Sequence, residues 1–460
     1  MTALSLPRPR RVRPFAFLVA SLALVGASQI YAALQPAGSP SAALPPQTVA
    51  GPLAPPEAPV MLAPGSITRI DHSIAAWTAN LAANDRDFLS AGNLGLLYEA
   101  RARLSGDVTD YERAMEAADR SLAIEPRQLD VQALHARVQL ATHDFSKALA
   151  EAEIVDRAAP AQPAVLAIIG DARLELGDLD GAALAYDQLA NLVPGPAVTA
   201  RLARIDFLRG DPAGAVSKAE AAYADATAEG QAGPALSWYA YLAGTLSLSA
   251  GAPDNSAAWF DKALAAWPES FMALAGRARA AAAIGDVEAA IRGYRAAIAI
   301  APQPEALTAL GDMLALQGEQ REAEQHYDTV LAIARLQGGA DGLVYNRQLV
   351  LFNVNHDRDT AEALTLAERE LAERKDAYGY DAHAWALLAN GRAAEADASM
   401  ARALAFGTRD ATLLYHAGEI ARTLGHRDRA RGFLEAALAI RGALDPLSAA
   451  RAAAVLEAVR

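Results

Sequence analysis

The stretch GDVEAAIRGYRAAIAIAP at 285–302 has two relatives in the same chain. They are GDLDGAALAYDQLANLVP at 177–194 and GAPDNSAAWFDKALAAWP at 251–268. Each of the three has eighteen residues, begins with glycine, has an aromatic residue at its tenth position and ends with proline. The copies that begin at residues 251 and 285 are 34 residues apart, and a fixed period of this length indicates a repeat architecture.

The residues around each turn glycine predict a helical hairpin. In PEALTALGDMLALQG at 304–318, apolar and small residues recur every three or four positions, which places them on one buried stripe of a helix. Gly318 follows the stripe, and glycine adopts a positive φ beyond a helix end at the lowest cost. The second helix has alanine near its start and an aromatic residue four positions later, as in Ala290 and Tyr294.

The pattern of one unit resembles the tetratricopeptide repeat. A small residue stands at position 8, Gly at 15, Ala at 20, an aromatic residue at 24, Ala at 27 and Pro at 32 of a 34-residue unit. The first residues of nine units in this register are Leu129, Pro163, Pro196, Ser237, Phe271, Pro304, Val344, Ala377 and Ala411. The resemblance implies an all-α fold, a right-handed superhelical solenoid of stacked helix-turn-helix repeats with about ten units and a capping helix.

Several units depart from this pattern. The unit at 129 has His143 in place of the turn glycine, the unit at 196 has Ala219 in place of the aromatic residue, and the unit at 344 has neither glycine nor proline. Two longer spacings fall at ADATAEGQAGPAL (224–236) and ARLQGGADGL (334–343). We expect an extended second helix and a glycine-rich loop there.

Five segments follow from these patterns. We expect a signal peptide or N-terminal transmembrane anchor at 1–34, because a basic start precedes an uncharged apolar run. A Pro/Ala-rich linker with nine prolines follows at 35–65, either a tether or a ligand for a proline-binding domain. N-terminal helices with a degenerate first repeat occupy 66–128, the tetratricopeptide-like repeats 129–444 and a C-terminal capping helix 445–460.

Composition limits the classes of partner and site. The chain of 460 residues has no cysteine, which excludes disulfides, thiolate metal sites and cysteine nucleophiles. Its formal charge is −13, and without the four arginines of the first thirteen residues the body has 37 basic and 54 acidic residues. Such a body repels nucleic acid and anionic membrane. We therefore expect no nucleic-acid partner, and membrane contact only through the N-terminal segment.

No pattern for catalysis or cofactor binding stands out. The nucleophile elbow, the phosphate-binding loop, the dinucleotide fingerprint and the H-E-x-x-H zinc motif are all missing from the sequence. We therefore expect no catalytic residue, no cofactor and no metal site. The alternative is a metal-binding or catalytic role for the C-terminal histidines His356, His383 and His416, if helices bring them together. Packing or loop histidines are the plainer interpretation.

The resemblance implies that the first helices line a concave groove and bind an extended peptide or protein partner through positions 2, 5, 9 and 12. The groove residues expected from this register are Arg137, Arg204, Trp238, Tyr241, Arg279, Tyr345, Phe352, Tyr378, Trp385 and Tyr415. The arginines could hold a partner carboxylate by paired hydrogen bonds. An aromatic packing layer is the alternative interpretation of YDAHAWALL at 380–388.

These observations lead to an expected function. We expect a non-enzymatic protein–protein interaction scaffold or adaptor of the bacterial cell envelope, either periplasmic or anchored in the inner membrane and facing the periplasm. Exported bacterial proteins of the resembled family serve in the assembly of envelope complexes, pili or cytochromes. The sequence does not select among these.

Overall fold

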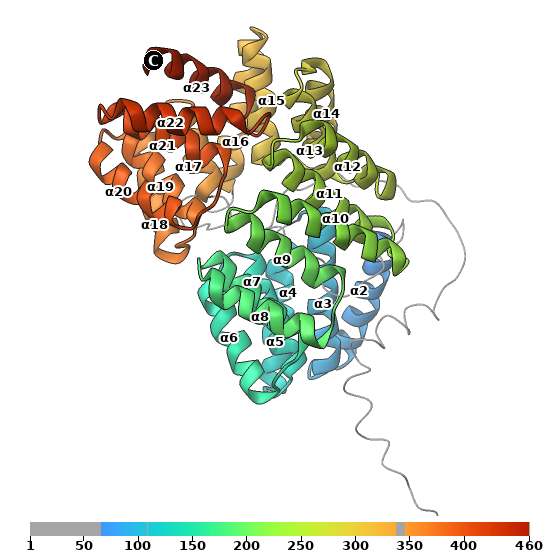
Figure 1. The fold of residues 1–460 in the computed structure, drawn as a ribbon. Helices are drawn as coiled ribbons and strands as arrows, with labels where there is room; N and C mark the ends of the chain where they lie inside the picture. The colour runs from blue at the N-terminus through green and yellow to red at the C-terminus, as the bar shows by residue number, and fades with distance from the viewer. Residues whose placement is uncertain (1–65, 108, 337–345, 460) are drawn as a thin grey trace, which may run out of the picture. The chain divides into compact units, whose positions relative to one another are not determined.

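The computed structural model describes residues 66–107, 109–336 and 346–459 (Figure 1). All regular secondary structure in these ranges is α-helical. The segments expected at 1–34 and 35–65 lie outside the described residues, as does Tyr345. Of the helices in the described ranges, none combines the length and the apolar character needed to cross a membrane.

The helices form consecutive hairpins. The first helices of the hairpins are α3 (Phe88–Ser105), α5 (Leu129–Ala141), α7 (Pro163–Glu175), α9 (Pro196–Leu208), α11 (Gly233–Ser249), α13 (Phe271–Ala283), α15 (Pro304–Leu316), α17 (Asn346–Asn355), α19 (Ala377–Ala389) and α21 (Ala411–Thr423). The second helices are α4 (Thr109–Ile124), α6 (Phe145–Ala158), α8 (Leu179–Leu192), α10 (Pro212–Ala228), α12 (Pro253–Ala266), α14 (Val287–Ile300), α16 (Gln320–Leu336), α18 (Thr360–Glu373), α20 (Ala393–Ala405) and α22 (Arg427–Ala439). Helix α2 (Ser66–Ala83) precedes them and α23 (Pro446–Val459) follows.

Each helix packs on the next one along the chain, although α16 and α17 meet mainly through the rings of Tyr327 and Phe352. The fold class expected from the sequence is confirmed (Figure 1). The first helices of seven units begin at the residue that the repeat register gives. Helix α11 begins four residues earlier, at Gly233, and Val344 lies outside the described residues. The extended second helices are present as α10 and α16, which have 17 residues each, whereas α8 and α12 have 14.

Two of the repeated stretches begin with Gly-Asp, and both residues have a role in the turn between the helices. The turn glycines Gly177 and Gly285 have φ of 87° and 85°, a region that other residues reach only at a cost. The next residues, Asp178 and Asp286, cap the second helix by accepting hydrogen bonds from the backbone N–H three residues later, at 2.9 and 3.0 Å. Where the register lacks glycine, His143 takes the positive φ of 67°.

Small residues allow the two helices of a hairpin to approach closely. The alanines at position 20 are all fully buried, namely Ala148, Ala182, Ala215, Ala290, Ala323, Ala363, Ala396 and Ala430. The glycine at position 8 leaves space for the aromatic ring at position 24. A Cβ at Gly170 or Gly311 would overlap the ring of Tyr186 or Tyr327. The residues that the repeats share at these positions are therefore explained by close packing between the two helices of a hairpin.

Candidate functional site

The first helices of neighbouring units contact one another, for example α5 with α7, α17 with α19 and α19 with α21. We call the surface that they share the first-helix face. Three ion pairs join one first helix to the next across it: Glu99–Arg137 (3.3 Å), Asp171–Arg201 (2.8 Å) and Glu175–Arg204 (2.9 Å). Two carboxylate–histidine contacts do the same, Asp381–His416 (2.8 Å) and Asp312–His356 (2.7 Å), where His356 directly follows α17. We call these five contacts the polar ladder. Since each pair joins two units, this polar ladder orients consecutive hairpins as well as filling the face.

The most enclosed step of the ladder joins α7 to α9. Arg201 is 1% exposed and Asp171 is 3% exposed. The guanidinium donates two hydrogen bonds to the carboxylate, from Nε at 3.0 Å and from Nη2 at 2.8 Å. The hydroxyl of Tyr186 donates a third bond to the same carboxylate at 2.7 Å. A buried carboxylate with three donors is rigid, so this step is structural.

The same arrangement recurs four units later with a histidine. Tyr327 donates to Asp312 at 2.7 Å, from the same two positions of its unit as Tyr186 and Asp171. Nε2 of His356 lies 2.7 Å from the Asp312 carboxylate, and its ring centroid lies 4.6 Å from that of Tyr327. Position 9 of a unit is therefore an acceptor site for its own position 24 and for the next unit.

Charged side chains from four helices meet around Glu175. Its carboxylate pairs with Arg204 of α9 and with Arg374, which follows α18. Arg347 of α17 pairs with Glu370 at 2.7 Å, next to this group. Burial alone would raise the pKa of the Glu175 carboxyl, but the arginines, Arg374 first, outweigh it and lower that pKa to about 2. The Glu175 carboxyl is therefore ionised at neutral and mildly acidic pH.

This pKa predicts how stability depends on pH. Glu175 has an ordinary pKa of 4.5, and the lowered folded value means that its carboxylate stabilises the fold above that pH. The contribution is lost as the pH falls from about 4.5 towards about 2. We expect Glu175→Gln to lower the urea midpoint at pH 7, with a deficit that narrows steadily below pH 4.5.

The matched control is Glu288→Gln, because Glu288 is exposed and its one ion pair among the described residues is with Arg292 at 3.4 Å. This control should change the midpoint little at either pH. A Glu175→Gln deficit that stays constant between pH 7 and pH 3 would contradict the role given to these arginines.

The three histidines of the metal alternative do not converge. His356 pairs with Asp312, His416 pairs with Asp381 and stacks on Trp385 at 4.0 Å, and His383 contacts the hydroxyl of Ser399 at 3.0 Å. Across the part of the chain that the structure describes, no three His, Asp or Glu side chains are grouped so as to hold a metal ion. The geometry therefore favours packing roles for these histidines.

Comparison with known proteins found distant matches among solved structures and none among sequences. No model of a protein family matches the chain, and neither does any curated protein sequence. Among solved structures, the human IFIT1 dimer with PPP-AAAA is 15% identical, with 82% of this chain and 86% of the other aligned and a TM-score of 0.43. Yeast Tom70 is 12% identical, with 85% of this chain and 92% of Tom70 aligned and a TM-score of 0.37. A tetratricopeptide repeat protein from Parabacteroides merdae is 17% identical, with 57% of this chain and 98% of the other aligned and a TM-score of 0.33.

The hairpin geometry decides the fold: helix pairs at the 34-residue period, a close-packed glycine at position 8 and an aromatic ring on it from position 24. This chain folds as a tetratricopeptide-repeat solenoid. The first helices of such a solenoid are the ones whose residues differ from unit to unit, so they are the place to look for binding.

Four aromatic residues expected in the groove of the solenoid are buried. Trp238, Phe352, Trp385 and Tyr415 are 3% to 8% exposed and belong to the core clusters between units. Trp385 also donates from Nε1 to Asn355 at 2.8 Å. Their surroundings are those of an aromatic packing layer, because each first helix is covered by the second helix of its own hairpin and by the two neighbouring units. Their contact with a partner stays a prediction.

The remaining expected groove residues divide into two groups. Arg137 and Arg204 belong to the polar ladder, and Tyr378 is half-buried beside Arg347, with 5.8 Å from guanidinium to ring centroid. Arg279 on α13 is exposed, and its Nη2 donates to the backbone carbonyl of Ala443 at 3.0 Å. Within the described ranges no ion pair involves Arg279. It is thus an arginine of this face whose charge is available.

Two further residues stand on the first helices next to α13. Burial raises the pKa of Tyr241 on α11, while the charge of Arg279 lowers it and that of Glu305 raises it. Glu305 on α15 is solvent-accessible yet closely surrounded by protein, and this partial desolvation raises the pKa of its carboxyl. Sequence reasoning did not single out Glu305, although it stands at position 2 of its unit, one of the groove positions.

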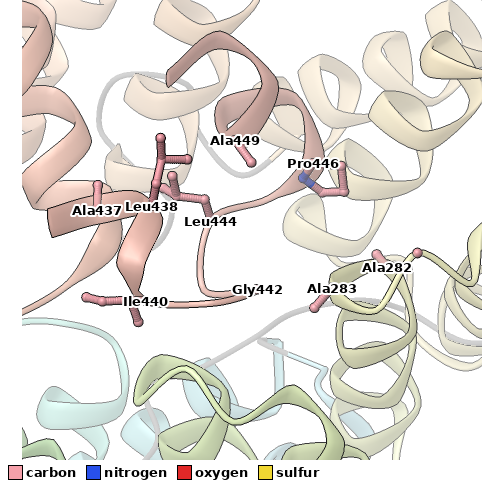
Figure 2. A pocket seen from close by; sticks show the side chains of 10 residues that line it. Ala282, Ala283, Ala437, Leu438, Ile440, Gly442, Leu444, Pro446 and Ala449 are labelled. Atoms are coloured by element: carbon pink, nitrogen blue, oxygen red, sulfur yellow. The ribbon is translucent and has the colours of Figure 1, made fainter. Parts of the chain in front are cut away.

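An apolar cavity of about 270 Å³ lies next to this region. Figure 2 shows it between Ala282 and Ala283, at the end of α13, and the segment from α22 to α23 with Leu438, Leu444 and Ala449. Its lining residues are all apolar. The cavity therefore offers space for an apolar group and no hydrogen-bonding side chain to orient one.

Proposed function

We propose that this protein is a non-enzymatic scaffold or adaptor that binds a peptide or protein partner on its first-helix face. The observation that carries the proposal is the exposed Arg279 on the first helix α13, which takes part in no ion pair within the described ranges. Most other charged groups of the face already neutralise one another in the polar ladder. An accessible guanidinium offers several N–H donors in a fixed planar arrangement to an acceptor group of a partner.

The chemistry of the site favours a partner segment that presents a carboxylate. An arginine binds a carboxylate through two parallel hydrogen bonds, which fixes the orientation of the bound group. The guanidinium of Arg279 now donates only to the neutral carbonyl of Ala443, an interaction that a carboxylate exceeds in strength. The acidic body of the chain makes a protein or peptide a better partner than a nucleic acid.

The test begins with cross-linking and mass spectrometry in the native cell, which identifies the partner. Arg279→Ala is then expected to weaken binding of that partner roughly tenfold or more, a loss of about 1.4 kcal/mol or more, because arginine is enriched among the residues that dominate binding energy. Arg277→Ala is the matched control. It lies on the same helix, and its guanidinium pairs with Asp261 on α12 at 2.8 Å. Equal affinities of the two variants would refute the site.

Trp385→Ala does not serve as a binding test. Trp385 is 8% exposed and packs against His416 and Tyr415 in the core between α19 and α21. Its removal would leave a cavity and change folding together with binding.

We also propose that the protein works in the bacterial cell envelope, exported or anchored through residues 1–34. The proposal rests on the arginines at the start of the chain and the uncharged run from Phe15 to Leu34. A reporter enzyme that is active only in the periplasm, fused after Gly65, should be active in a bacterial host. Activity that persists after deletion of residues 2–34 would refute the proposal.

A further inference from the structure

The apolar cavity adjoins the guanidinium of Arg279. This guanidinium donates to the carbonyl of Ala443 at 3.0 Å, and the residues on either side of Ala443, Gly442 and Leu444, line the cavity. On α13, Ala282 lies three residues after Arg279, about 4.5 Å further along the helix axis, and lines the other side of the cavity (Figure 2). The guanidinium and the cavity therefore belong to one region, formed by α13 and the segment from α22 to α23.

The cavity has room for a large apolar side chain. Its volume of about 270 Å³ exceeds the roughly 150 Å³ of an engineered apolar cavity that binds benzene. Of the ten lining residues, Ala437 and Leu444 are buried and the others are partly or fully exposed, so the cavity opens to solvent. An apolar group that enters leaves water and gains dispersion contacts with the lining atoms. A leucine or phenylalanine side chain can thus bind in the described conformation.

The group next to the cavity is a cation. Arg279 is exposed, and the N–H groups that do not donate to Ala443 can donate to a carboxylate. The segment from Ala437 to Ala449 has one carboxylate, Asp445, and this side chain accepts a hydrogen bond from the backbone N–H of Ser448 at 2.8 Å. The charge and the lining together are complementary to an acidic group beside an apolar one.

We propose that Arg279 and this cavity form one bipartite site, which binds a partner segment with an aspartate or glutamate two positions from a phenylalanine or leucine. The inference rests on the proposed function for the existence of a partner, and it adds the apolar half of the recognised sequence. In an extended segment, side chains two positions apart lie on one face, about 7 Å from each other. One of them reaches the guanidinium while the other enters the cavity.

The position of α13 favours a side-chain carboxylate over a chain terminus. Helix α13 is the sixth of the ten first helices in the described ranges. A segment that follows the first-helix face therefore extends beyond this helix on both sides. It passes the bipartite site in its interior, where its acidic groups are side chains.

The test uses a defined peptide and the full chain. The peptide is acetyl-Gly-Ser-Asp-Gly-Phe-Ser-Gly-amide with 4-fluorophenylalanine as its aromatic residue, because fluorine NMR detects binding even at a millimolar Kd. Unlabelled variants of the peptide are compared by displacement. Replacement of Phe by Ala is expected to weaken binding about tenfold, and replacement of Asp by Asn several-fold. Absence of peptide binding would overturn the site.

Two cavity variants test the apolar half. Ala449→Leu fills the cavity from α23 and should remove the preference for Phe over Ala, whereas the matched control Ala450→Leu should keep it. Ala450 is the next residue of the same helix and is exposed. Ala282→Leu fills the cavity from α13 and gives a second reading if Ala449→Leu does not fold, which circular dichroism shows. A preference for Phe that survives filling would overturn the role of the cavity.

Arg279→Ala tests the charged half with the same peptides. It should remove the preference for Asp over Asn and keep the preference for Phe over Ala, whereas Arg277→Ala should keep both. A preference for Asp that is the same in these two variants would overturn the role of Arg279. Tighter binding of acetyl-Gly-Ser-Gly-Phe with a free carboxylate would replace the side-chain carboxylate by a chain terminus.

The chain itself offers another occupant. Glu57 is the one acidic residue between residues 35 and 65, and apolar residues surround it in the sequence. Tighter peptide binding by the Glu57→Gln variant would mean that this segment competes for the site, and would overturn the assignment to a partner. Unchanged binding supports the assignment.

The inference and the proposed function can fail separately. If Arg279→Ala leaves the affinity of the cross-linked partner unchanged, the proposed function fails, whatever the peptide shows. If Arg279→Ala weakens that partner and Ala449→Leu affects it no more than Ala450→Leu, the proposed function stands and the bipartite site is refuted.

Discussion

Replacement of Arg201 by methionine is expected to lower the free energy of unfolding by about 3–5 kcal/mol. The change removes one partner of a buried ion pair and leaves the Asp171 carboxylate, 3% exposed, with the hydroxyl of Tyr186 as its side-chain donor. Methionine fills a similar volume, so the loss reports the uncompensated charge. Urea denaturation measures the loss, and hydrogen exchange in α7 and α9 localises it.

The control and the rescue separate charge from packing. Arg295→Met removes an exposed ion pair with Glu322 (2.7 Å) and should change stability by less than about 1 kcal/mol. Combining Arg201→Met with Asp171→Leu and Tyr186→Phe replaces the whole buried network by apolar groups and should restore most of the loss. If Arg201→Met costs no more than Arg295→Met, this step of the ladder does not hold the units together.

Gly170→Ala is expected to lower the free energy of unfolding by about 1–3 kcal/mol, the cost of overpacking a core. Alanine is the better helix former by about 1 kcal/mol, so propensity alone predicts the opposite sign. The overlap of a Cβ with the ring of Tyr186, which is fully buried and held by Asp171, decides the outcome. Gly432→Ala is the matched control.

Gly432 also lies inside a helix, α22, and a Cβ there would meet nothing within 4 Å. We expect this substitution to raise stability by up to about 1 kcal/mol in the same urea experiment. Stabilisation by both substitutions would mean that the ring of Tyr186 moves aside freely, and the packing explanation of position 8 would be wrong.

The hairpins could be predicted because their signals are local. Helix starts at residues such as Pro163, Phe271 and Ala411 follow from turn glycines, helix caps and apolar periodicity within one unit. The pairing of Asp171 with Tyr186 lies within one unit as well, and its recurrence at Asp312 and Tyr327 is visible once the register is known.

The surface of the first helices was harder to predict. Trp385 and Arg279 both stand at position 9 of their units, yet Trp385 is buried and Arg279 is exposed. A first helix packs against its own hairpin partner and against both neighbouring units, so only a narrow strip of it faces solvent. A rotation of a few tens of degrees between units moves a side chain across that strip, and no pattern within a unit determines this rotation.

The sequence by itself determined the period, the hairpins and the reason for the repeated letters, because each depends on residues close together in the chain. Only the tertiary structure decided which charges pair between units and that Gly177, Gly210 and Gly251 meet loops nearly two hundred residues away. The physical reason is that small rotations between successive units add up along the stack. Their sum brings Arg374 to Glu175 and Ala443 to Arg279.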